Sequence, residues 1–82
     1  MSEVIGVNPI MTTWTVYASP ADFPNAPYVV RGWLIGPGGQ VADSGALGFA
    51  DTLDEARGMI PAGLYRMERS PDDDPVIVET WL

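Results

Sequence analysis

The stretch YVVRGWLI, at residues 28–35, decides the fold of this chain. It is rich in β-branched and aromatic side chains, a composition typical of a strand. Successive side chains on a strand point to opposite faces of a sheet, so the stretch divides into two sets. One set is Tyr28, Val30, Gly32 and Leu34, and the other is Val29, Arg31, Trp33 and Ile35. The sequence GPGG follows at 36–39 and must turn the chain.

Further strands are expected on both sides of this segment. By composition and turn signals they are 12–18 (TTWTVYA), a short strand within 40–49, 64–69, and 75–82. The one within 40–49 is interrupted by Gly45 and Gly48. The polar sequence SPDDD at 70–74 has a suitable length for the loop of a terminal hairpin. Three prolines in 19–27 predict a rigid, irregular loop there.

One helix is expected, at 51–60. Thr52 followed three residues later by Glu55 matches the capping box, in which the two side chains accept hydrogen bonds from free amides of the first turn. Pro61 ends the helix. The residues that share its apolar face at helical spacing are Leu53, Ala56 and Ile60.

This order of elements predicts an α+β fold: a single antiparallel sheet of four or five strands with one short helix packed on one face. Residues 11–82 are expected to form this single domain. The break at Asn8-Pro9 and the second methionine, Met11, predict that 1–10 is an N-terminal extension or flexible arm. The alternative is a short edge strand that uses Val4, Ile5 and Val7.

The amino-acid composition excludes most kinds of catalytic site. The chain has 82 residues with no histidine, no cysteine and no lysine, so its four bases are all arginines. Imidazole bases, thiolate or imidazole metal ligands, cysteine nucleophiles and disulfides are therefore excluded. A serine nucleophile would have only a carboxylate as base, and no spacing arranges one. We expect a non-enzymatic protein with no catalytic residue, no metal site and no cofactor.

Charge indicates the kind of partner. The net charge of −7 repels nucleic acid and anionic lipid, and four scattered arginines do not form a basic stripe. A basic protein, such as one that binds nucleic acid, suits this surface better, although acidity also serves solubility alone. The longest apolar run is 28–35, well short of the roughly 20 residues that span a bilayer. We expect no membrane contact and a cytoplasmic location in a bacterial host.

Two motifs are candidate ligand sites. Asp72, Asp73 and Asp74 are the one dense charge cluster, but the spacing fails the calcium-loop pattern because Ile77 stands where glycine is required. A solvated hairpin tip is the simpler interpretation, and a weak Mg²⁺ or Ca²⁺ site is the alternative. The glycines at 36–39 lack the lysine of a phosphate-binding loop and predict a β turn.

The sheet face away from the helix is the strongest candidate for a partner site. If charged residues point outward, alternation predicts an exposed set of Tyr17, Arg31, Trp33, Ile77 and Trp81, with Glu79 beside them. Tryptophan, tyrosine and arginine dominate interface energetics, and the acidic loop of Asp72, Asp73 and Asp74 would add charge. Alternatively, 19–27 or 1–10 covers this face, or the alternation is displaced by one residue on some strand.

A resemblance adds context. The runs WTVY at 14–17, YVVR at 28–31, TLDEAR at 52–57 and DDPVIVETW at 73–81 resemble a group of short uncharacterised proteins from proteobacteria and their phages. In size and acidity the chain is also similar to phage-encoded inhibitors of host defence, including anti-CRISPR proteins. The resemblance implies a mobile-element setting and carries no catalytic residue.

We therefore expect a small acidic protein that acts by binding a protein partner, such as a host nucleic-acid-binding defence complex. The alternative is a self-associating, homodimeric accessory or structural protein. A small-molecule-binding or enzymatic domain would instead require a deep pocket with convergent polar groups.

Overall fold

The computed structural model describes residues 10–68, 70–72 and 74–82 of the chain. Its elements follow the chain in this order: β1 (Met11–Ala18), β2 (Tyr28–Ile35), the 3-10 turn η1 (Pro37–Gly39), β3 (Val41–Ala50), α1 (Leu53–Gly58), β4 (Arg66–Glu68) and β5 (Ile77–Trp81). The strands form one antiparallel sheet of order β3-β2-β1-β5-β4. The predicted α+β fold is confirmed.

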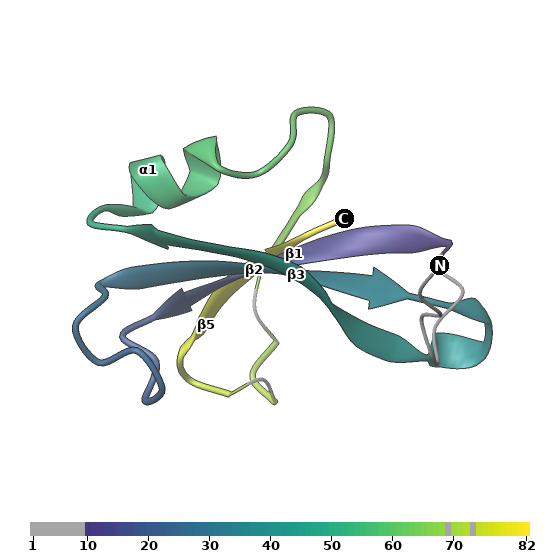
Figure 1. Cartoon of the computed structure of the whole chain (residues 1–82), viewed down its shortest axis with the longest axis horizontal. Coiled ribbons are helices and arrows are strands. Elements are labelled where there is room, and N and C mark those ends of the chain that lie inside the picture. Colours follow the sequence, from purple (N-terminus) through teal and green to yellow (C-terminus); the bar gives the residue numbers. More distant parts are fainter. Residues whose placement is uncertain (1–9, 69, 73) are drawn as a thin grey trace.

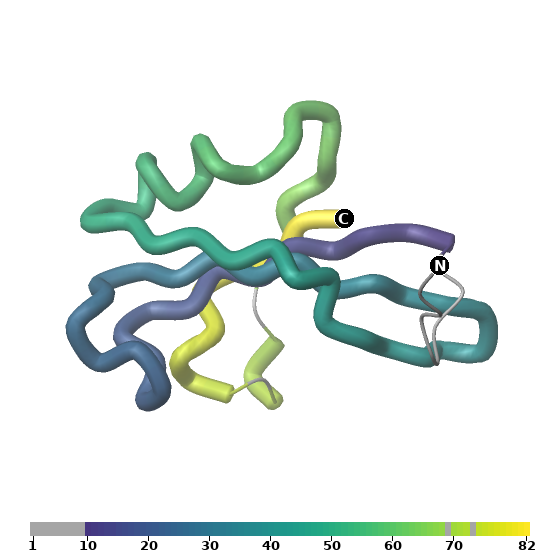
Figure 2. The backbone as a smooth tube through the Cα atoms, in the orientation of Figure 1, coloured from purple at the N-terminus to yellow at the C-terminus, as the bar shows by residue number. Residues whose placement is uncertain are grey.

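The helix lies on one side of the sheet, and the loop between β1 and β2 lies on the other (Figure 1). The turn that joins β2 to β3 lies at the end of the molecule away from the helix, as the backbone trace shows (Figure 2). Because β3 and β4 are the two edge strands, the segment containing α1 must cross the sheet to connect them. This crossing places α1 over the core.

The core lies between α1 and the sheet. Its buried members are Val16, Val30, Ala50, Ala56 and Ile60, and partly buried side chains packed against them are Trp14, Tyr28, Leu53, Leu64, Val78 and Trp81. Alternation on β1 and β2, together with the apolar stripe of the helix, supplies most of this cluster, as predicted. Ala50 and Leu64 join the core from β3 and from the segment after α1, and Trp81 contradicts the prediction that placed it on the other face.

The strand bounds differ from prediction mainly at the sheet edges. Strand β2 has the predicted bounds, whereas the short strand expected within 40–49 is β3, the longest of the five at ten residues. Gly45 does not end it, because its positive φ of 86° forms a bulge in which the Asp43 carboxylate accepts the Gly45 amide at 2.8 Å. Strands β4 and β5 are shorter than the predicted 64–69 and 75–82.

The helix begins at the predicted cap and ends early. Thr52 Oγ1 accepts the amide of Glu55 at 3.1 Å, while Glu55 Oε1 accepts the amide of Asp51 at 3.0 Å, one residue before the usual capping-box partner. At Met59 and Ile60 the amides bond three residues back instead of four, so the last turn is tightened and the α-helix covers Leu53–Gly58, not 51–60.

The Thr52 cap supports a direct stability test. Thr52→Ala should lower the free energy of unfolding by about 1 kcal/mol, because it leaves the Glu55 amide without its acceptor. In so small a domain this loss should lower the melting midpoint by several degrees, measurable by circular dichroism. Thr52→Ser keeps the hydroxyl and should retain most of the stability. Equal melting of the alanine variant and the parent chain would show that the cap contributes nothing.

The predicted N-terminal arm falls almost wholly outside the described residues. Of 1–10, the structure describes Ile10 alone: its amide donates to the Ile35 carbonyl at 2.8 Å, and its side chain is exposed. The arm and the alternative strand through Val4, Ile5 and Val7 therefore stay predictions.

Candidate protein-binding site

Four of the predicted partner-binding residues share the sheet face away from α1. In the strand register, Thr13 lies opposite Trp33 and Thr15 opposite Arg31, on the pleat opposite to Trp14 and Val16. Tyr17 and Ile77 pair across β1 and β5 on this same face. Tyr17, Arg31, Trp33 and Ile77 are therefore brought to one side of the sheet, as expected.

Trp81 and Glu79 lie on the other face, so their predicted outward placement is wrong. A β-bulge leaves Val78 without an opposing residue, so Ile77 pairs with Tyr17 but Glu79 pairs with Val16. The bulge interrupts the two-residue alternation of β5. The side chains after Val78 therefore point to the face opposite to the one that strict alternation predicts. Trp81, opposite Trp14, then packs against the core and does not join the proposed surface.

The 19–27 loop covers part of the face that carries Tyr17 and Arg31. Pro20 is buried, and Val29 beneath the loop is only 1% exposed. Phe23 packs edge-on against Phe49 of β3, with ring centroids 5.0 Å apart. A hollow of only about 70 Å³ remains between the loop and the Tyr17 and Arg31 side chains. The covering loop that the sequence left as an alternative is thus present over this half.

Arg31 is held by groups of its own chain. Its guanidinium lies 3.9 Å from Asp22 and 4.0 Å from Asp43, and 5.7 Å from the centre of the Trp33 ring. Both carboxylates are more than half exposed, so solvent screens these long ion pairs. Arg31 thereby offsets acidic charge on this face and offers little to an acidic partner.

The acidic hairpin loop has a turn-forming role. The Asp74 carboxylate accepts the Val76 amide at 3.1 Å, and the Asp72 amide donates to Ser70 Oγ at 3.3 Å. Asp72 and Asp74 are exposed, and Asp73 lies outside the described residues. Within the described part of the chain, no group of three or more acidic side chains is placed to hold a metal ion.

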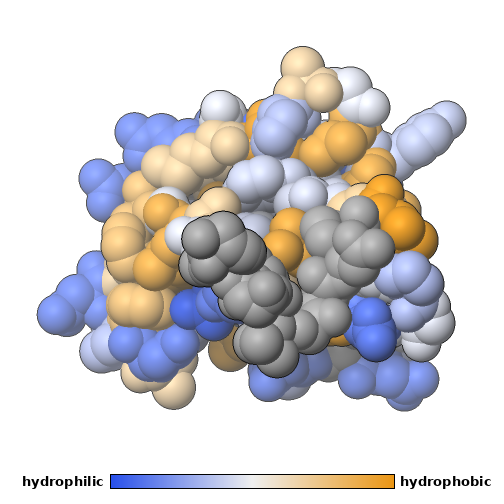
Figure 3. Space-filling view, turned by 45° about the vertical axis from the view of Figure 1, so that its right-hand side comes forward, coloured by the Kyte–Doolittle hydropathy of each residue, from blue (hydrophilic) through white to orange (hydrophobic). Residues whose placement is uncertain are grey.

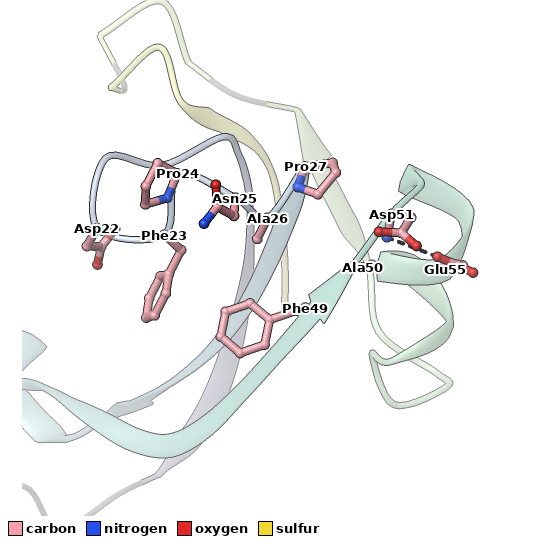
Figure 4. A pocket seen from close by; sticks show the side chains of 10 residues that line it. All are labelled: Asp22, Phe23, Pro24, Asn25, Ala26, Pro27, Phe49, Ala50, Asp51 and Glu55. Atoms are coloured by element: carbon pink, nitrogen blue, oxygen red, sulfur yellow. Dashed lines mark hydrogen bonds between the residues drawn. The ribbon is translucent and has the colours of Figure 1, made fainter.

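A pocket opens beside the covered half of this face. It has a volume of about 510 Å³ and lies between the 19–27 loop, the end of β3 and the start of α1. Figure 4 shows the Phe23 ring, from the loop, beside the Phe49 ring of β3, and this contacting pair forms the aromatic part of the lining. The ten lining residues are Asp22, Phe23, Pro24, Asn25, Ala26, Pro27, Phe49, Ala50, Asp51 and Glu55.

Acidic groups stand at both ends of the pocket. Asp22 lies on the loop side, whereas Asp51 and Glu55 lie on the helix side (Figure 4). Glu55 uses Oε1 to accept the Asp51 amide, which leaves its second oxygen for a ligand. The carboxylate of Asp51 makes no hydrogen bond or ion pair with the described residues. None of the ten lining residues is basic, and although Asp22 lies 3.9 Å from Arg31, no ion pair joins Asp51 or Glu55 to a described residue, so the pocket combines an aromatic surface with negative charge at its helix side.

Sequence reasoning missed this pocket. Phe23 lies in a proline-rich loop, where no strand or helix pattern predicts its position. Phe49 stands at the end of a segment whose glycines are unfavourable to a long strand. One signal was available, since the alternation of β3 puts Val41, Leu47 and Phe49 on one face and only small residues on the other. A strand with large apolar side chains on one face can pack or bind another apolar group there, as Phe49 packs against Phe23.

Glu79 forms a buried charged cluster on the helix face. Its side chain is 1% exposed and accepts from Arg57 twice, at 2.8 and 3.0 Å, and from the Trp81 indole at 2.7 Å. Arg66 adds a longer ion pair at 3.8 Å. The hydrogen bonds from Arg57 hold the pKa of Glu79 below its ordinary value. With both its oxygens accepting hydrogen bonds, this carboxylate fastens α1 to β5.

Comparison with known protein families, with curated proteins and with solved structures finds no match for this chain. No described helix is long and apolar enough to cross a membrane. The function must therefore be argued from the pocket, the edge strand and the charge.

Proposed function

We propose that this chain is a non-enzymatic protein-binding domain that recognises a basic partner through the pocket beside Phe49. The observation that carries the proposal is an aromatic pair flanked by carboxylates with no basic residue among the lining groups. A cationic side chain gains both from the ring faces and from the acidic ends. The net charge of −7 steers a basic partner toward the domain from a distance.

The lining groups favour binding over catalysis. They contain no hydroxyl, thiol or imidazole, so carboxylates are the only lining side chains that could act as nucleophile or base. Asp51 and Glu55 stand close together on the helix side, and Glu55 is already engaged in capping. These features suit recognition of charge.

The class of partner follows from the same chemistry. A protein that binds nucleic acid presents arginines and lysines on its working surface, and an acidic domain that occupies them competes with the nucleic acid. We propose this competition as the mode of action, in keeping with an inhibitor of a nucleic-acid-binding defence complex encoded on a mobile element.

A second candidate function is self-association through β3. This edge strand of ten residues leaves Val41, Leu47 and Phe49 exposed, and unpaired strand edges of this kind pair readily with other chains. Sedimentation equilibrium distinguishes the two functions: a monomer at micromolar concentration rules out the dimer.

The test is a comparative affinity purification from the host. The parent chain, the pocket variant Phe49→Ala/Asp51→Asn and the control Tyr65→Ala serve as three baits; Tyr65 is 82% exposed and lies outside the pocket. We expect a basic protein to be retained by the parent and the control. Its affinity for the pocket variant, measured with the purified pair, should fall about thirtyfold. Equal retention by all three baits would contradict the proposal.

A further inference from the structure

The backbone edge of β3 is available for pairing. In the strand order β3 has β2 on one side and no described strand on the other. Natural edges are usually protected by shortness, charge or proline. The opposite edge, β4, is three residues long and carries Arg66 and Glu68, whereas β3 has ten residues and only Asp43 as a charge.

Hollows flank β3 on both faces of the sheet. One is the acidic aromatic pocket, which Phe49 and Ala50 help to line. The other, of about 490 Å³, lies on the helix side and is lined by Trp14, Val30, Gly45, Ala46, Leu47, Gly48 and Met59. None of its lining side chains is charged. Figure 3 shows hydrophobic residues, in orange, at several separate places on the side of the molecule that it presents.

An added strand would use both hollows at once. Its successive side chains point to opposite faces, so one side chain enters the acidic pocket while its neighbours lie on the apolar helix side. The sequence that satisfies both is a basic residue between apolar ones. We infer that the partner contributes an extended segment of this pattern, with an arginine, which pairs with β3 near Gly48–Ala50. This inference rests on the proposed function and names the recognition element.

Arginine fits the pocket better than lysine. Its planar guanidinium stacks on aromatic rings and presents a fork of donors that matches a carboxylate. Phe23 and Phe49 supply the rings, and Asp51 supplies a carboxylate without another partner among the described residues. A lysine ammonium offers the charge alone, without the stacking plane.

A second copy of the chain does not fit this role. Its β3 would bring Asp43 and no base to the acidic pocket, and both molecules carry a net charge of −7. Like charges brought together disfavour such pairing. The occupant is therefore a basic segment of a different protein.

The experiment titrates the intact protein with acetyl-Thr-Val-Arg-Val-Thr-amide and follows its amide resonances by NMR. We expect saturable shifts at Gly48, Phe49 and Ala50. The citrulline peptide, which keeps the shape and loses the charge, should bind at least tenfold more weakly, and the lysine peptide should be intermediate. A peptide N-methylated at alternate residues, which cannot pair with the strand edge, should also bind at least tenfold more weakly.

Protein variants locate the contact. Asp51→Asn should lower the affinity for the arginine peptide. Asp54 is an exposed acid at the same end of the helix but outside the pocket, so Asp54→Asn should leave this affinity unchanged. Equal binding of the arginine and citrulline peptides, insensitivity to N-methylation, or no shift at millimolar peptide would each overturn the inference. The proposed function would survive such a failure if the affinity purification still identifies a pocket-dependent basic partner by another recognition element.

Discussion

Replacing Glu79 with alanine should lower the free energy of unfolding by about 3 kcal/mol, the upper end of the range for losing hydrogen bonds to a buried charged group. Glu79 is 1% exposed and receives hydrogen bonds from both Arg57 and Trp81, so its loss leaves a cavity and an indole without an acceptor. Small domains have only about 5–15 kcal/mol in total. The variant should therefore be close to unfolding at 37 °C, as urea denaturation will measure.

Glu68→Ala is the matched control for this substitution. Glu68 lies directly opposite Glu79 in the β4–β5 pair but is exposed. Removing it takes away a like charge and should leave stability unchanged or slightly raised. Equal losses in the two variants would show that the buried cluster does not fasten the helix to the sheet.

The same cluster makes stability depend on pH. Because Arg57 holds the folded-state pKa of Glu79 below the unfolded value of about 4.3, its contribution is fully present above that value. It is lost as the pH falls through the folded-state pKa, when the carboxyl becomes protonated. Glu79→Gln should therefore flatten the acid limb of the stability curve.

The second large effect is a difference in folding stability between the alanine variants of two tryptophans. Trp81→Ala should cost about 3–5 kcal/mol of folding stability, because Trp81 packs against the core and donates to Glu79 at 2.7 Å. Trp33→Ala should cost less, about 1–2 kcal/mol, because Trp33 is also half-buried but lies on the opposite face, where its ring contacts the Arg31 guanidinium. Thermal melting of both variants measures the difference.

This pair also tests the register of β5. The alternation that groups Trp81 with Trp33 predicts that both variants behave alike. The bulge at Val78 predicts that Trp81→Ala is destabilised clearly more than Trp33→Ala. Similar melting midpoints would contradict the placement of Trp81 in the core.

Local patterns predicted the fold because they act over a few residues. The composition of 28–35 and the glycines after it specify strand β2 and its turn. The Thr52 cap likewise specifies where α1 begins. An antiparallel sheet with a helix on one face follows from the order of these elements and the short connections between them.

The candidate site was not predictable because it depends on contacts between distant segments. The bulge at Val78 arises where β5 meets β1, and the sequence of β5 alone does not mark it. The burial of Glu79 follows from that bulge and from Arg57, 22 residues away. The pocket likewise requires the packing of Phe23 on Phe49.

The most direct test of the central claim is photo-cross-linking from the rim of the pocket. A photoreactive phenylalanine analogue replaces Asn25, an exposed lining residue, and in a control protein it replaces Tyr65. We expect a basic partner to be cross-linked from position 25 and not from 65, with the adduct next to an arginine in an extended segment, and the arginine peptide to compete with it. Cross-links from position 65 alone, or only to a second copy of this chain, would contradict the account.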